Sequence, residues 1–107
     1  MSDKAKQTKL VSPVRSIRTS INRNSQAAID LARAVWKLAE PPMKEFKSAD
    51  LLQQYLCDAG FKADRPWAVL PTAFRASIGK GGPKIAFLAE YDALPDCGVK
   101  WKVATPG

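Results

Sequence analysis

The sequence predicts a small α/β fold in which two amphipathic helices are followed by a β-hairpin. Apolar residues recur at helical spacing in two segments, residues 25–40 and 48–59. Further on, an alternating segment (72–78) and a continuous apolar run (85–89) flank a glycine-rich turn. The length of 107 residues allows one domain at most, and 46% apolar with 25% charged residues is typical of a globular protein.

The first predicted helix begins near Asn24 or Ser25, either of which can cap it, and ends before Pro41. Its apolar side chains predict one broad buried face. They are Ala28, Ile29, Leu31, Ala32, Val35, Trp36 and Leu38. Because Trp36 lies inside this stripe, core packing is favoured over stacking on a ligand.

The second predicted helix is capped by Ser48, with Asp50 in the first turn, where the helix dipole favours a negative charge. Gly60 supplies the left-handed residue that ends many helices. The predicted buried face of this helix contains Leu52, Tyr55, Leu56 and Ala59.

The predicted hairpin pairs residues 72–78 with residues 85–89 across the turn at 79–83. Residues 61–69 are ambiguous, since Pro66 interrupts any long strand there. The turn lacks the spacing of a phosphate-binding loop and no helix follows it, so a plain turn is the favoured interpretation.

Two carboxylates, Glu90 and Asp92, directly follow the apolar run. Such a run suits a strand covered on both faces, and ligands of α/β sheets bind beyond the carboxyl ends of the strands. Side chains two residues apart in an extended backbone point the same way, so the pair could hold a divalent metal or act as a base and an orienting group. A metal site usually needs three or four ligands, and the spacing of other residues supplies none.

The net charge of +7 is concentrated in the two ends of the chain. Residues 1–23 carry +5 and residues 97–107 carry +2, whereas residues 24–96 are neutral. We interpret 1–23 as a basic flexible arm or a weak helical lead-in. A solvated arm is favoured over nucleic-acid binding, which stays open as an alternative.

The chain contains no histidine, which removes the commonest general base and transition-metal ligand. Cys57 falls in a helical pattern and is predicted to be buried or half-buried, and Cys97 is a lone loop cysteine. Neither a secretory signal nor a membrane-spanning run is visible, so a cytoplasmic location without membrane partners is the expectation.

Residues 26–96 resemble the aminoacylase/carnosinase-type metallopeptidases, in the branch of hippurate hydrolase and p-aminobenzoyl-glutamate hydrolase. The resemblance depends on residues 36–41, 44–52, 70–76 and 84–95, above all on the string Glu-Tyr-Asp-Ala-Leu-Pro at 90–95. It implies hydrolysis of small-molecule amides, either N-acyl amino acids or dipeptides, by a homodimeric enzyme with a pair of Zn or Mn ions. Asp92 matches the aspartate that supports the metal centre, and Glu90 matches a position that binds metal as histidine in sister branches.

The departures from this family predict a truncated piece of a larger α/β metallopeptidase catalytic domain. The family continues into a His-x-Cys-Gly-His metal motif, later supplies a glutamate base, and runs to several hundred residues. The expectation is therefore a partial catalytic domain at 24–96, inactive alone and without a cofactor of its own. Residues 97–107 form an atypical tail, and an out-of-frame reading is one hypothesis for it, because codons shifted by one base allow a Cys and a His there.

Two functions of other classes stay open. The chain could be a small basic binding module whose arm contacts nucleic acid. It could also be a regulatory partner that pairs an exposed strand with a full-length relative.

Overall fold

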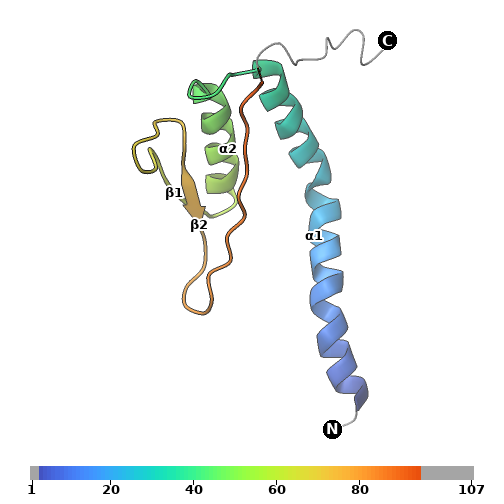
Figure 1. Ribbon diagram of the computed structural model, residues 1–107. Coiled ribbons are helices and arrows are strands. Elements are labelled where there is room, and N and C mark those ends of the chain that lie inside the picture. The colour runs from blue at the N-terminus through green and yellow to red at the C-terminus, as the bar shows by residue number, and fades with distance from the viewer. Residues whose placement is uncertain (1–2, 95–107) are drawn as a thin grey trace, which may run out of the picture. The chain divides into compact units, whose positions relative to one another are not determined.

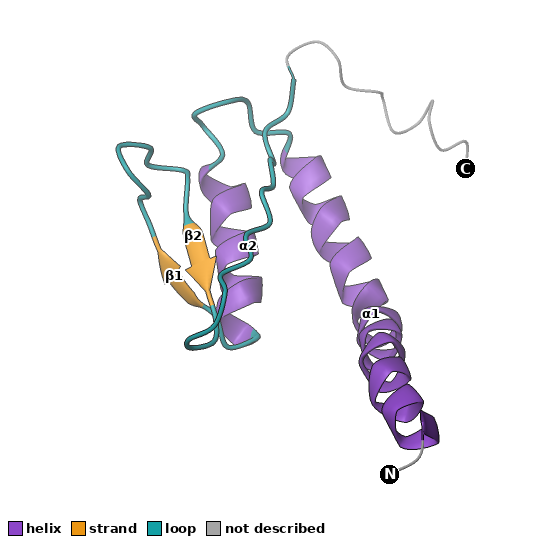
Figure 2. Ribbon diagram, turned by 60° about the horizontal axis from the view of Figure 1, so that its bottom comes forward, coloured by secondary structure: helices purple, strands orange, loops and turns teal. Residues whose placement is uncertain are grey.

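The computed structural model describes residues 3–94, which form two helices and a two-stranded antiparallel sheet (Figures 1 and 2). In chain order these are α1 (Asp3–Leu38), α2 (Phe46–Asp58), β1 (Lys62–Asp64) and β2 (Arg75–Ser77). The predicted fold class, two helices followed by an antiparallel pair of strands, is confirmed. Cys97 and the tail 97–107 lie outside the described residues. Neither helix of the described residues contains an apolar stretch of the length that a membrane span requires.

Helix α1 begins at Asp3, well before the predicted start near Asn24 and Ser25. Both of these side chains bond to the preceding turn of the helix. The side-chain amide Nδ2 of Asn24 donates to the Ser20 carbonyl at 2.8 Å, and Ser25 Oγ donates to the Asn22 carbonyl at 2.9 Å. The capping prediction was wrong because short polar side chains that suit a cap can also bond backwards within a helix. The segment predicted as an arm is thus helical from Asp3, and its flexibility stays a prediction.

Helix α1 does not bury the broad stripe expected from its sequence. Its last turns keep Leu31, Val35 and Leu38 half-buried, whereas Ile29 and Trp36 are 46% and 45% exposed. The core position predicted for Trp36 was therefore wrong. Helical spacing shows which side chains share a face, but it does not show whether another element covers that face.

Helix α2 begins at Phe46, two residues before the predicted cap at Ser48. Ser48 is consequently fully buried inside the first turn, and Asp50 lies beyond that turn. The C-terminal end agrees with the sequence: Gly60 has a φ of 99° and donates to the Cys57 carbonyl at 3.0 Å. The Phe61 amide donates to the Leu56 carbonyl at 3.0 Å, which completes a Schellman motif.

The carboxylate of Glu40 supplies the missing acceptors at the start of α2. It accepts hydrogen bonds from the backbone amides of Ser48 (2.6 Å, Oε1) and Lys47 (3.1 Å, Oε2). The first amides of a helix have no partner within the helix, and a negative charge at this end is favoured by the dipole. The pKa of Glu40 is held below its ordinary value of 4.5: desolvation raises it, but hydrogen bonds from Ser48 and Lys47 and the Lys47 charge outweigh that effect.

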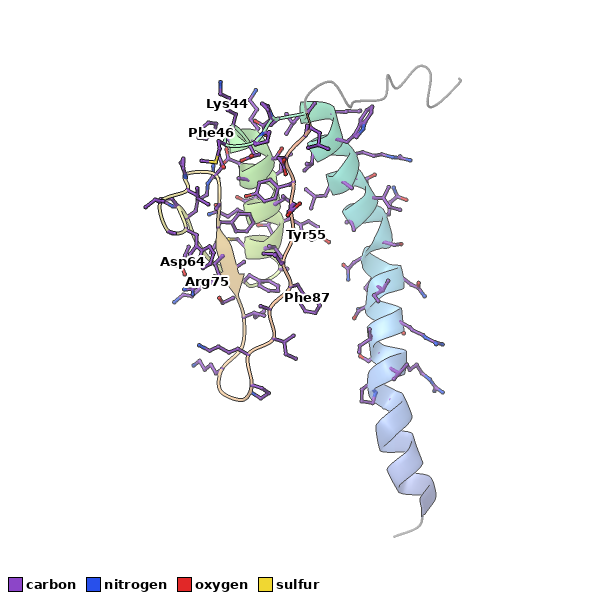
Figure 3. All side chains as sticks on the ribbon, viewed as in Figure 1. Lys44, Phe46, Tyr55, Asp64, Arg75 and Phe87 are labelled. Carbon is purple, nitrogen blue, oxygen red and sulfur yellow. The ribbon has the colours of Figure 1, made fainter. Side chains whose placement is uncertain are left out.

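The sheet pairs β1 with β2, so the predicted pairing of 72–78 with 85–89 was wrong. Asp64 lies opposite Arg75 in the register, and their side chains form an ion pair of 3.0 Å, near each other in Figure 3. Ala63 and Ala76 are half-buried, and both strands pack against α2. The ambiguous segment after Gly60 therefore supplies the partner strand, because Pro66 follows β1 and does not interrupt it.

Residues 85–89 form no strand, and residues 79–90 are all exposed. The chain reverses at 79–83, as predicted, and 84–94 then runs as an extended loop alongside α2 (Figures 1 and 2). An apolar run becomes a strand only when another strand accepts its backbone hydrogen bonds, and residues 3–94 provide no such partner for it.

The buried centre of the described chain is largely polar. Ala49 is the one fully buried apolar side chain among the described residues, and the buried polar side chains are Glu45, Ser48 and Thr72. Leu52, Tyr55 and Leu56 are half-buried on the predicted face of α2, whereas Ala59 is exposed. Cys57 is also exposed, contrary to expectation, because it lies off that face.

The substitution Glu40→Gln should lower the melting temperature at neutral pH, since it removes the charge at the start of α2. A group with a depressed pKa in the folded state stabilises fully above its unfolded pKa and loses this effect as pH falls through the folded pKa. The difference in melting temperature between wild type and variant should therefore shrink as the pH falls below about 4.5.

The matched control is Glu90→Gln, at an exposed position. It should leave the melting temperature nearly unchanged at each pH. A pH-independent difference for Glu40→Gln would contradict the capping role of its charge.

Candidate functional site

The predicted site residues Glu90 and Asp92 are both exposed. They lie near the end of the extended loop 84–94 and not at the end of a strand. The sequence predicted that the two carboxylates follow a buried strand, but within residues 3–94 no strand precedes them directly. What the structure does show is how the backbone on each side of Asp92 is held.

Asp92 lies between two anchored neighbours. The Tyr91 hydroxyl donates a hydrogen bond to the Thr72 carbonyl, and the Ala93 amide donates to the Glu40 carbonyl at 2.7 Å. The ring of Tyr91 also packs at a tilt against Phe74, with 6.2 Å between the ring centroids. Anchors on both sides fix the backbone of Asp92 while its carboxylate faces solvent.

The anchor at Tyr91 continues into the buried centre through Thr72 and Glu45. Thr72 is 3% exposed, and its hydroxyl donates to Glu45 Oε2. The other oxygen, Oε1, accepts from the Met43 amide at 2.6 Å, so both oxygens of the 7% exposed Glu45 carboxylate have partners. A buried charge needs such hydrogen bonds to offset its desolvation.

The Tyr91 phenol is suited to donate a hydrogen bond. Burial, followed by the negative charge of Glu45, raises its pKa above the ordinary value of 10.0, against the opposing effect of the Arg65 charge. The phenol therefore stays protonated at neutral pH.

Arg65 joins the loop after β1 to the start of α2. Its guanidinium forms an ion pair with Asp50 and donates to the carbonyls of Pro71 (3.2 Å) and Phe46 (3.4 Å). The Arg65 side chain is 16% exposed. These bonds fix the loop that presents Thr72 to Glu45 and Tyr91.

The described residues do not fit a metal centre by themselves. Among the side chains that the structure describes, those of residues 12–94, no three of His, Cys, Asp or Glu gather where they could hold one ion. Divalent-metal sites in proteins usually need at least three such ligands. The arrangement presents the exposed Asp92 carboxylate on a backbone that is held on both sides.

The anchoring residues Glu40, Glu45, Thr72 and Tyr91 were not expected from the sequence to act together. Tyr91 was visible as part of the string at 90–95, and Glu40 as the residue before Pro41. No spacing rule joins these positions, because Tyr91 bonds to Thr72, Thr72 bonds to Glu45 and Ala93 bonds to Glu40 across the fold.

Curated proteins similar to this chain include one of the subunits of the p-aminobenzoyl-glutamate hydrolase of Escherichia coli (strain K12). It is 42% identical over 80 residues, which are 75% of this chain and 17% of that protein. Another is the Xaa-Arg dipeptidase of Mus musculus, 37% identical over 78 residues, or 64% of this chain and 18% of that protein. Over part of its length, the chain is a relative of these hydrolases. The resemblance stated from the sequence is confirmed at this level.

The chain spans less than a fifth of the length of these curated relatives. No family model matches the chain. No solved structure matches it significantly.

The substitution Tyr91→Phe should lower the free energy of unfolding by about 1 kcal/mol, since it removes one hydrogen bond and keeps the ring. The Ala93 amide should exchange with solvent faster, because one of the two anchors of the loop is lost. Urea unfolding and hydrogen exchange measure the two effects.

Tyr55→Phe is the matched control, on the half-buried face of α2. It should change the unfolding free energy by less than about 0.5 kcal/mol and leave the exchange of Ala93 unchanged. Equal effects of the two substitutions would show that the Tyr91 hydroxyl does not hold the loop.

Proposed function

We propose that this chain contributes part of the catalytic module of a metal-dependent amidohydrolase acting on N-acyl amino acids or dipeptides. The observation that carries the proposal is 42% identity over 80 residues to the Escherichia coli p-aminobenzoyl-glutamate hydrolase. The second relative is named as a dipeptidase, and both names denote cleavage of an amide bond. For this chain we therefore propose a substrate whose amide bond is cleaved, as in N-acyl amino acids and dipeptides.

Asp92 is the residue proposed to support the metal centre, and Glu90 is the second candidate, through its match to a metal-binding position of sister branches. Anchors on both sides of Asp92 and exposure of its side chain support this assignment. A group that orients metal ligands must itself be held in place, which the bonds of Tyr91 and Ala93 accomplish. The Zn or Mn ions would require ligands from outside residues 3–94, because the described residues do not form a complete site.

The remaining parts of the proposal concern the whole enzyme. A homodimer, a small-molecule amide substrate and a cytoplasmic location are proposed from the resemblance and the sequence. Nucleic-acid binding by the basic segment, which the sequence disfavours, and pairing with a full-length relative stay open as alternatives.

A chimera tests whether this chain can do the work of its relative. In the similar subunit of the Escherichia coli p-aminobenzoyl-glutamate hydrolase, the 80 aligned residues are replaced by the corresponding residues of this chain. The chimeric subunit is combined with the rest of that enzyme, and hydrolysis of p-aminobenzoyl-glutamate is measured. The chimera should be active. Within it, Asp92→Asn should lower kcat by about 10- to 100-fold, the effect typical of groups that support metal ligands.

Asp58→Asn, at an exposed position at the end of α2, is the control in the same chimera and should retain activity within about twofold. Circular dichroism and metal content show whether each chimera is folded and loaded. A folded, metal-loaded chimera that is inactive, or one in which the two substitutions have the same effect, would refute the proposed role.

The 107-residue chain alone should not hydrolyse N-acyl amino acids or dipeptides in the presence of Zn or Mn. The chain contains no histidine, and no three metal-ligating side chains gather among the described side chains of residues 12–94. Metal-dependent turnover that persists through repurification, and that Asp92→Asn removes, would overturn this expectation.

A further inference from the structure

Residues 84–90 form an exposed and mainly apolar segment of the extended loop. The exposed fractions are 79% for Ile85, 94% for Phe87 and 96% for Leu88, and every residue from 84 to 90 is exposed. Figure 3 shows Phe87 pointing away from the sheet. Unpaired apolar segments of this kind are templates for pairing with another strand.

The backbone of this segment is also unpaired within the described chain. The strand pairing among residues 3–94 is confined to β1 and β2, apart from an isolated bridge between Trp67 and Leu70. The loop that contains the segment is fixed at its far end by the bonds of Tyr91 and Ala93. The backbone amides and carbonyls of 84–90 are thus available to another strand, and the loop is fixed just after them.

The charges at the two ends of the segment indicate which strand fits it. Lys84 and Glu90 lie three residues before and three residues after Phe87, and the residues between are uncharged. In an antiparallel pair of two copies centred on Phe87, each Lys84 lies opposite the other copy's Glu90. In a parallel, in-register pair, Lys84 would face Lys84 and Glu90 would face Glu90. Opposite charges across a pair stabilise it, and like charges destabilise it.

We infer that residues 84–90 form an interface through which two copies of this chain associate as an antiparallel strand pair about a two-fold axis at Phe87. Such an interface is isologous, with each residue at the same place in both copies. The two Phe87 rings meet at the axis, and Ile85 faces Ala89 on each side. The inference concerns the 107-residue chain and does not rest on its relation to amidohydrolases.

The neighbouring registers are less favourable. A pair centred on Ala86 leaves Lys84 opposite Leu88, without an ion pair. A pair centred on Leu88 would put Lys84 opposite Asp92, but it would draw Tyr91 into the new strand although its side chain is already anchored at Thr72. The register centred on Phe87 uses only exposed residues.

Charge reversal tests the inference in the full chain. Sedimentation is measured between about 1 µM and about 1 mM, the range expected of weak complexes. Wild type should show a reversible monomer–dimer equilibrium. Lys84→Glu or Glu90→Lys alone should raise the dimer Kd about tenfold, because each creates two like-charge pairs. The double variant K84E/E90K should restore the Kd to within about twofold of wild type.

Cross-linking tests the register. In a background with Cys57→Ser and Cys97→Ser, Phe87→Cys should oxidise readily to a disulfide-linked dimer, because position 87 faces itself. Leu88→Cys, which faces Ala86 in this register, should cross-link much more slowly. This control carries the same thiol one residue away.

Three results would overturn the inference. The first is a monomer at all concentrations, which would also be the result if the segment pairs only with a full-length relative. The second is a dimer or larger aggregate whose Kd does not respond to the single reversals or is not restored by the double variant. The third is faster cross-linking at position 88 than at position 87.

Discussion

The structure depends on how the start of α2 satisfies its backbone amides. These amides need acceptors, and the short connection after α1 supplies them from a glutamate that precedes two prolines. Glu40 caps the helix from outside, while Glu45 enters the protein interior and is bonded by Met43 and Thr72. Because few apolar side chains are buried in the described residues, the separate hydrogen bonds of Glu40 and of Glu45 help to hold the helix, the loop after β1 and the 91–93 loop.

Related hydrogen bonds fix the position of the candidate site. The neighbours of the exposed Asp92 are held, because Tyr91 donates to the Thr72 carbonyl and the Ala93 amide donates to the Glu40 carbonyl. A single carboxylate cannot build a metal centre alone, even where its backbone is held.

The apolar run at 85–89 is exposed, and two different strands would be able to cover it. Within the described residues its backbone has no strand partner and its side chains are exposed, so the run is open to pairing with another strand that would cover them. In a larger catalytic module of the kind proposed, further strands of the sheet would do so. In the 107-residue chain, a second copy has the complementary charges at the right separation.

The sequence alone determined the features that depend on neighbouring residues. The helix end at Gly60, the apolar face of α2 and the reversal at 79–83 follow from local backbone preferences and spacing, and the string at 90–95 carried the relation to amidohydrolases. Only the tertiary structure decided which segment pairs with β2, what caps α2 and what anchors Asp92. Strand pairing, the hydrogen bonds that link Tyr91 to Thr72 and Thr72 to Glu45, and the bond from Ala93 to Glu40 join residues far apart in the chain, and no local pattern specifies such contacts. For the same reason, the apolar stripe of α1 and the run at 85–89 predicted burial that the described residues do not provide.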